Sequence, residues 1–333
     1  MSVTVRGKPS KGTMLEAGPM DSAVRIGREF VVPGHGHATA AETAPLKPSG
    51  IIKFQAPEIV FGPESLAEAG FAARRIGAQR PFVVADPGII AAGWADELSQ
   101  HLADADLPAT FWSGLTPNPK DFEIAEGYQR YREMGCDVII AIGGGSCLDA
   151  AKGIAILNAV RLVFDNLPRI VDRDATGDLR DHMAQASLEA GMAFTNALLG
   201  ATHAMSHQVG GLLDLPHGVV NGVLLPHVIR FNAAVAPDRF VPLAQAAGLA
   251  VAPGMPGEEA GYMLADRVRA IADELGVPRG LAELGVAPGS VPTLAANALA
   301  DACLATNPRP VSQADLAALF MPPSSATDEL LQR

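Results

Sequence analysis

The stretch that decides the fold is CDVIIAIGGGSCLDAAKGIAILNAVRLVFDNLPRIV, residues 136–171. It opens with a short run of β-branched apolar residues and then passes through three glycines and a serine at 143–146. Apolar residues at helical spacing follow the serine. We therefore predict a buried strand, a tight glycine turn and a long helix, in that order. In parallel sheets, ligands bind beyond the carboxyl ends of such strands.

The residues before this stretch alternate between strand-like and helix-like patterns. We predict strands in RPFVVAD (80–86) and LPATFWSG (107–114), helices over 89–106 and 121–135, and a further candidate strand in PEIVFG (57–62). Strands that alternate with helices of this length indicate βαβ units and a parallel sheet. After residue 142 no convincing strand follows, and the chain is predicted to be helix with loops to about residue 320. Three or four strands make a small sheet for a nucleotide-binding domain.

The composition limits the classes of function. The chain has 333 residues, of which 48% are hydrophobic and 18% are charged, with a net charge of −11 and no run of Lys or Arg. This balance argues against a nucleic-acid or anionic-membrane partner. The apolar runs are too short for a membrane span, no signal peptide is evident, and three scattered cysteines cannot form a disulfide framework. We expect a cytoplasmic protein.

The glycine-rich turn is a candidate nucleotide site. Bare glycines let a diphosphate approach the backbone, and the following helix N-terminus offers unpaired N–H groups and a favourable dipole. The alternative is a structural turn in which Ser146 is the helix N-cap and Asp149 completes a capping box. Asp86, after the first strand, is a candidate for a ribose contact that favours NAD, but Asp-Pro-Gly is also a common turn sequence.

Three histidines are concentrated in THAMSHQVGGLLDLPHG, residues 202–218. His203 and His207 are four residues apart and share one face if 195–213 is helical, whereas His217 is expected in the following loop. Two imidazoles on adjacent turns and a third from a loop can approach one divalent cation. Histidines at this spacing are also common as packing or surface residues, so both interpretations stay open at this point.

These two stretches together resemble the iron-containing, or group III, alcohol dehydrogenases. The resemblance rests on GGGSCLDAAKGIAI, on NALLGATHAMSHQVGGLLDLPHGVVNGVLLPHVIRFN (196–232), on TPNPKDFEIAEGYQRYREMGCDVIIAIGGGS and on ALADACLATNPRP, and it covers residues 51–320. It implies an α/β plus all-α protein, with a truncated Rossmann-like parallel-sheet domain followed by a helical metal-binding domain. The implied domains are 51–157 and 158–322, flanked by a disordered extension at 1–50 and a tail at 323–333.

The resemblance also implies roles for individual residues. His203 and His217 match metal ligands, and His207 matches a catalytic residue that relays a proton or positions the substrate. The positions that match cofactor contacts are Gly144, Gly145, Ser146 and Asp149 in the pyrophosphate loop, Asp86 at the adenosine ribose, and Asn118 in TPNP. The implied cofactors are NAD and Fe(II), with Zn(II) or another divalent metal as alternatives. The implied substrate is a small primary alcohol or aldehyde, and a homo-oligomer is possible.

This chain departs from the family pattern in one region. Family members add an Asp and a His four residues apart as two further metal ligands, and a second cofactor segment of the type T-T-A-G-T. Neither is present here, and both would belong between Ile156 and Arg161. A long internal deletion explains both losses and the missing strands. We therefore predict an NAD-dependent, divalent-metal-dependent alcohol dehydrogenase that is impaired in this chain. The alternatives are a catalytically inactive truncated member and a non-enzymatic interaction protein.

Overall fold

The computed structural model describes residues 60–171, 177–195 and 197–322. Its sheet, within these ranges, has three parallel strands in the order β2-β1-β3. The strands are β1 (Pro81–Ala85), β2 (Thr110–Trp112) and β3 (Val138–Ile142). Phe82 lies opposite Thr110 on one side and opposite Ile139 on the other. The three strands predicted from the sequence are thus confirmed. For the candidate strand at 57–62, residues 57–59 lie outside the described ranges and 60–62 are not in a strand.

The central strand β1 carries the core of this part of the molecule. Its five residues are all buried, and alternate side chains face opposite sides of the sheet. Val83 and Ala85 belong to a cluster with Leu98 and Leu102. Phe82 and Val84 belong to a second cluster, with Trp112, Tyr131, Cys147 and Ile154. The edge strand β3 is less well covered, because its residues 138–141 are all partly exposed.

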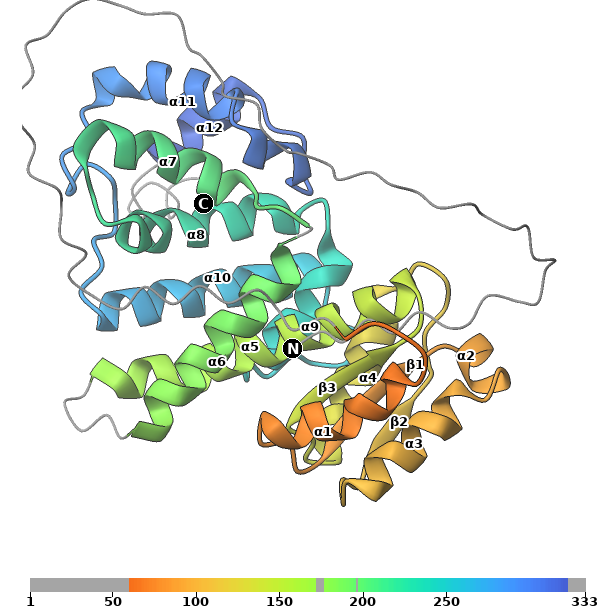
Figure 1. The fold of residues 1–333 in the computed structure, drawn as a ribbon. Coiled ribbons are helices and arrows are strands. Elements are labelled where there is room, and N and C mark those ends of the chain that lie inside the picture. Colours follow the sequence, from red (N-terminus) through yellow and green to blue (C-terminus); the bar gives the residue numbers. More distant parts are fainter. Residues whose placement is uncertain (1–59, 172–176, 196, 323–333) are drawn as a thin grey trace, which may run out of the picture.

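Helices connect and flank these strands (Figure 1). They are η1 (Ser65–Ala67), α1 (Glu68–Arg75), α2 (Pro87–Ala91), α3 (Trp94–Asp104) and α4 (Asp121–Glu133). The prediction of one helix over 89–106 was wrong, because the chain breaks between α2 and α3 at Gly93. Gly93 has a φ of 82°, a left-handed conformation that a helix interior does not contain.

A single long helix, α5 (Gly145–Val171), follows β3 and leads into the helical part. The predicted domain boundary at 157/158 lies inside this helix, so no linker separates the two parts there. The C-terminal half of α5 packs on α6 (Gly177–Phe194) through Ala159, Leu162 and Ala186. At the junction, the buried Asn158 donates hydrogen bonds to both carboxylate oxygens of Glu189, at 3.1 and 2.9 Å.

The rest of the described chain is helical, as predicted. Its elements are α7 (Ala201–Leu213), α8 (His217–Ala233), η2 (Pro237–Arg239), α9 (Phe240–Ala246), α10 (Gly257–Glu274), η3 (Pro288–Ser290), α11 (Val291–Leu299), η4 (Ala302–Thr306) and α12 (Gln313–Phe320). A core that includes Met205, Val209, Leu224, Leu294 and Phe320 joins α7, α8, α11 and α12. None of the helices in the described ranges combines the length and hydropathy that a membrane span requires.

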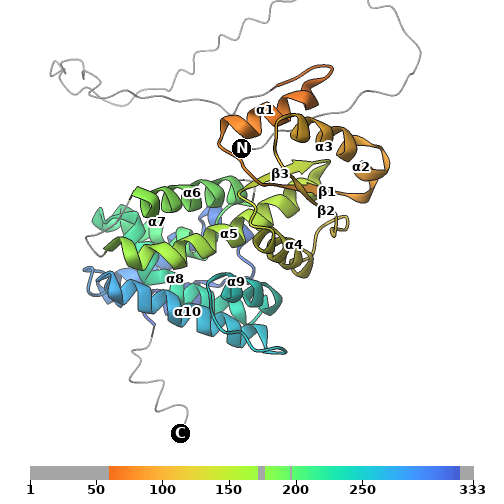
Figure 2. The same ribbon diagram turned by 90° about the horizontal axis from the view of Figure 1, so that it is seen from below.

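The sheet and the α7–α8 group lie at opposite ends of the molecule. Figure 1 shows the strands with α1 to α4 at one end and α7, α8, α11 and α12 at the other. Helices α5, α6, α9 and α10 lie between them, and Figure 2 shows α5 and α6 in the same intermediate position. The two ends also have separate hydrophobic clusters, one around β1 and one around α7 and α8.

Candidate functional site

The glycine-rich turn is built where β3 ends and α5 begins. Gly143 has a φ of 141°, and a Cβ atom there would lie 2.6 Å from Sγ of Cys147, so this position requires glycine for structural reasons. At Gly144 and Gly145 an added Cβ would meet no atom within 4 Å. The backbone of these two residues is therefore open on the side where a phosphate group would approach a helix N-terminus.

The prediction that Ser146 is the helix N-cap, with Asp149 completing a capping box, was wrong. Helix α5 already begins at Gly145, and the amide of Leu148 donates to the carbonyl of Gly144 at 3.2 Å. Ser146 therefore lies inside the first turn rather than at the N-cap. The exposed carboxylate of Asp149 lies 3.7 Å from Nζ of Lys152, an ordinary surface ion pair.

The carboxylate of Asp86 has two partners within the protein. It is the N-cap of α2, where Oδ1 accepts a hydrogen bond from the amide of Ile89 at 2.9 Å. Oδ2 accepts from the thiol of Cys147 at 3.3 Å. Burial raises the pKa of Cys147 to about 11, and the hydrogen bond to Asp86 adds to this effect. Asp86 thus has the local structural role that its Asp-Pro-Gly sequence suggested. A ribose hydroxyl would compete with the amide of Ile89 and the thiol of Cys147 for its carboxylate.

The cofactor candidates lie on one edge of the sheet. Asp86 follows β1, Asn118 lies in the loop after β2, and the glycine turn follows β3. Because the strands are parallel, their carboxyl ends share this edge, which is where open α/β sheets bind ligands. Asn118 is exposed with a φ of 57°, and its carbonyl accepts a hydrogen bond from Nζ of Lys120 at 2.8 Å. The arrangement supports the predicted roles without testing them.

The three histidines converge on one another at the other end of the molecule. The ring centroids of His203 and His217 lie 5.3 Å apart, those of His207 and His217 5.6 Å, and those of His203 and His207 6.2 Å. His217 was predicted in a loop, but it is the first residue of α8, directly after the N-cap Pro216. The helix that carries His203 and His207 begins at Ala201, later than the predicted start at 195.

The surroundings of His203 favour its neutral imidazole form. Burial lowers the pKa of His203, and the nearby His217 and His207 lower it further. Neutral imidazole is the form that ligates a metal. The buried hydroxyl of Ser206 lies 3.4 Å from Nδ1 of His217 and donates to the carbonyl of His203 at 3.2 Å. Ser206 therefore links the backbone of α7 to the ring of His217.

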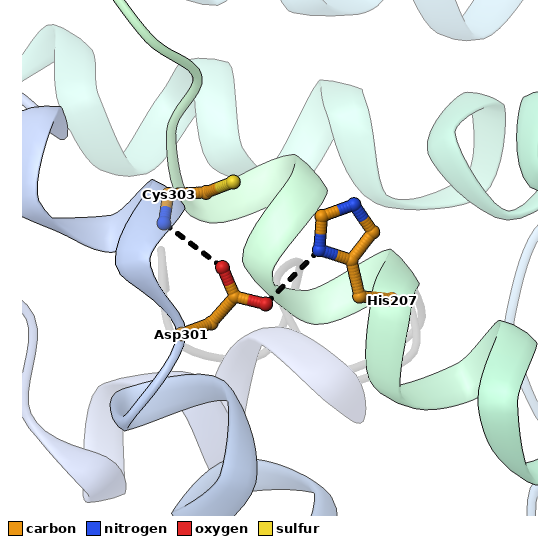
Figure 3. A group of neighbouring side chains, drawn as sticks. All are labelled: His207, Asp301 and Cys303. Carbon is orange, nitrogen blue, oxygen red and sulfur yellow. Dashed lines mark hydrogen bonds and ion pairs between the residues drawn. The ribbon is translucent and has the colours of Figure 1, made fainter. Parts of the chain in front are cut away.

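Two further residues lie beside His207 and were missed by the sequence analysis. Asp301 is the N-cap of η4, where its Oδ1 accepts from the amide of Cys303 at 2.9 Å, and its Oδ2 lies 3.0 Å from Nδ1 of His207. Figure 3 shows the carboxylate between the amide of Cys303 and the ring of His207. The segment ALADACLATNPRP was noted only as part of a resemblance, and nothing in it indicates a contact with a helix 94 residues earlier.

The side chains near the histidines show whether a metal site with four ligands, as the resemblance implies, can form here. Within the described ranges, one group of His, Cys, Asp and Glu side chains brings three possible ligand atoms together, and it consists of His207, Asp301 and Cys303. His203 and His217 are not part of that group. The pair therefore offers two imidazoles without a carboxylate beside them, and it does not by itself fit the four-ligand site that the resemblance implies.

Comparisons with known proteins agree with the order of these two parts along the chain. Residues 56–182 match the model of the iron-containing alcohol dehydrogenases, and residues 152–322 match that of the C-terminal domain of the Fe-containing alcohol dehydrogenase family. This chain belongs to the iron-containing alcohol dehydrogenase family. It is thereby an alcohol or aldehyde oxidoreductase by family, with a nucleotide-binding fold followed by a helical domain, as the sequence predicted.

Relatives of this iron-containing alcohol dehydrogenase have named activities. It is 27% identical to 1,3-propanediol dehydrogenase of Citrobacter freundii, over 78% of this chain and 95% of the relative. It is 25% identical to lactaldehyde reductase of Escherichia coli strain K12, over 74% of this chain and 92% of the relative. A crystal structure of 1,3-propanediol oxidoreductase matches with 26% identity and a TM-score of 0.48, over 78% of this chain and 96% of that structure.

The length of the first of these alignments is consistent with the predicted deletion. It runs over 369 residues, which is more than the 333 residues of this whole chain. The relative therefore contains residues that have no counterpart here. Both family matches include residues 152–182, which lie largely on α5, the helix in which the predicted junction falls. The three-stranded sheet of the described ranges, with residues 138–141 of β3 partly exposed, is consistent with such a shortening.

Proposed function

We propose that this protein is a shortened NAD-dependent and divalent-metal-dependent alcohol dehydrogenase whose ligand binding and turnover are impaired. The observation that carries the proposal is the incomplete histidine cluster. Three imidazole rings converge within 6.2 Å of one another, yet His203 and His217 have no carboxylate beside them in the described part of the chain. Relatives that act on 1,3-propanediol or lactaldehyde support a small alcohol or aldehyde as substrate.

The glycine turn supports NAD as the cofactor. The open backbone at Gly144 and Gly145 and the N-terminal dipole of α5 suit a diphosphate. Asp86 lies near the same turn, since a Cβ atom on Gly143 would be 3.1 Å from its Oδ2. A carboxylate at the end of β1 is the group that hydrogen-bonds an adenosine ribose and disfavours a 2′-phosphate. Because this carboxylate already accepts from Ile89 and Cys147, we expect weak NAD binding.

The histidine cluster supports a role for His207 in proton transfer. When Nδ1–H donates to Asp301, the lone pair of Nε2 is left to accept a proton from a substrate hydroxyl. His203 and His217 would hold the divalent metal, which when bound acts as a Lewis acid that lowers the pKa of the alcohol. With only two imidazoles and water, that metal would be bound weakly, because charge and chelation are both reduced.

The loss of the segment beside the nicotinamide supports the impairment. The glycine turn lies between β3 and α5, and the histidines lie on α7 and α8. Hydride transfer requires the two reacting carbons to be aligned at near-contact distance. The segment that packs against the nicotinamide in the complete family is missing here, so we expect the alignment to be poor.

Thermal unfolding with and without ligands tests this proposal. The full chain is heated alone, with NAD, and with Fe(II) or Zn(II) under anaerobic conditions. We expect one cooperative transition, a small upward shift with NAD that Gly144→Ala abolishes, and a small shift with Fe(II) that His203→Ala/His217→Ala reduces. Large shifts with both ligands would contradict impaired binding. An absence of any shift with NAD would support the alternative of an inactive family member.

A further inference from the structure

The side chains around Asp301 form a second candidate metal site that is separate from the His203/His217 pair. His207, Asp301 and Cys303 each offer one ligand atom, and these three atoms lie within 4.8 Å of one another. Ligand atoms around a tetrahedral Zn(II) lie about 3.5 Å apart, given bond lengths of roughly 2.0 to 2.3 Å. Small side-chain rotations therefore suffice to bring the three donors to one ion. His207 and Cys303 have the freedom to make them, because they are exposed and partly exposed.

From this geometry we propose that the group His207, Asp301 and Cys303 binds a thiophilic divalent cation of the Zn(II) type, and binds it more tightly than the His203/His217 pair does. The donor chemistry is the first argument. A thiolate, a carboxylate and an imidazole together carry two negative charges, which neutralise a dication, whereas two imidazoles carry none. The fourth position is left to water.

The carboxylate is held in place for this role by the backbone. Oδ1 of Asp301 accepts from the amide of Cys303 at the start of η4, which leaves Oδ2 directed at His207. Gln208 also reaches Oδ2, with its Nε2 at 3.4 Å. Asp301 is largely covered, with 16% of its side chain exposed, whereas 42% of His207 is exposed. A partly exposed, oriented carboxylate beside accessible imidazole and thiol groups gives an ion a route of entry.

Binding changes protons in a defined way. The thiol of Cys303 releases its proton as the Sγ–metal bond forms. When Nδ1 of His207 becomes the ligand, the ring proton lies on Nε2, and the contact with Asp301 is replaced by a shared metal. One proton is released for each ion bound. His207 then has no lone pair for a substrate hydroxyl, so an ion at this site inhibits any proton relay through that residue.

Anaerobic titration of the full chain with Co(II), a spectroscopic substitute for Zn(II), tests the site directly. A thiolate–cobalt bond gives a near-ultraviolet charge-transfer band that imidazole ligands do not give. We expect this band in the wild type, in Cys136→Ser and in His203→Ala/His217→Ala, and we expect its loss in Cys303→Ser and His207→Ala. Asp301→Asn, which keeps the η4 cap acceptor, shifts the midpoint to higher Co(II).

Several outcomes of these experiments would overturn the proposed metal site. No band in the wild type, or a band that survives Cys303→Ser, overturns the proposal. Tighter Co(II) binding at the His203/His217 pair than at His207, Asp301 and Cys303 also overturns the proposal. If Cys303→Ser fails to fold, alkylation of the wild type replaces it: Zn(II) is expected to protect Cys303 but not Cys136, and equal labelling of Cys303 with and without Zn(II) overturns the proposal. The double histidine variant keeps this test distinct from that of the proposed function.

Discussion

Nδ1 of His207 lies 3.0 Å from Oδ2 of Asp301, although the two residues are 94 positions apart in the sequence. The contact joins the histidine face of α7 to the N-cap of η4. Asp301 therefore has two structural tasks, because one oxygen caps η4 and the other orients an imidazole. The two tasks can be separated by substitution.

Asp301→Ala removes both tasks, whereas Asp301→Asn keeps an acceptor for the amide of Cys303. We expect the alanine variant to lower the free energy of unfolding by about 1 kcal/mol, the usual loss for an N-cap, and the asparagine variant to lose less. Denaturant unfolding of both variants near neutral pH measures the difference. Equal losses would show that the cap does not contribute.

The same residue gives a prediction about pH. Burial alone would raise the pKa of Asp301, but hydrogen bonds from His207 and from Cys303 outweigh it and lower the pKa below 3.8. A carboxyl with a depressed folded pKa stabilises the protein above its unfolded pKa and loses that contribution as the pH falls through the folded value. The stability gap between wild type and Asp301→Asn should therefore close in acid, and a gap that widens there would contradict this account.

Glu189 should show the opposite dependence. Burial raises its pKa above 4.5, against hydrogen bonds from Gln185 and Asn158. The charged form is thus disfavoured in the folded state, and stability falls as the pH rises from 4.5 through the folded pKa. Urea midpoints across this interval should fall for the wild type and stay level for Glu189→Gln. Parallel curves for the two proteins would show that burial does not perturb this group.

The glycine turn offers a matched pair of substitutions. At Gly143 a Cβ atom would meet Sγ of Cys147 at 2.6 Å in a backbone conformation with φ of 141°, so Gly143→Ala should cost about 1 to 3 kcal/mol of stability. Gly144→Ala meets open space and should leave stability nearly unchanged while weakening NAD binding. Calorimetry and thermal unfolding of both variants separate the two effects. A normal NAD affinity in Gly144→Ala would remove the turn from the cofactor site.

Local patterns in the sequence predicted much of this fold. The three strands, the glycine turn and the histidine helix each depend on the spacing of nearby apolar or glycine residues, which the sequence shows directly. The break at Gly93 was missed because one glycine does not interrupt helical periodicity, although it adopts a φ of 82°. The start of α8 at His217 was missed because His217 was expected in a loop, whereas Pro216 before it is the N-cap of the helix.

The candidate site could be predicted only in part. The three histidines are close in sequence, and helix geometry places His203 and His207 on one face. His217 joins them because α8 begins beside α7. Asp301 and Cys303 reach them through the packing of η4 on α7, a tertiary contact for which the sequence has no periodic signal. Their spacing, Asp-x-Cys before a helical turn, was the available hint, and it indicates only a cap.

The central claim is that this shortened chain retains half of each site and turns over poorly. The most direct measurement is NADH formation from NAD and a panel of short primary alcohols by the full chain, loaded anaerobically with Fe(II) or Zn(II), beside the variant His207→Ala. We predict a slow, metal-dependent rate with the wild type that His207→Ala abolishes. A wild-type rate no higher than that of His207→Ala with either metal would contradict the account and support the alternative of a catalytically inactive family member.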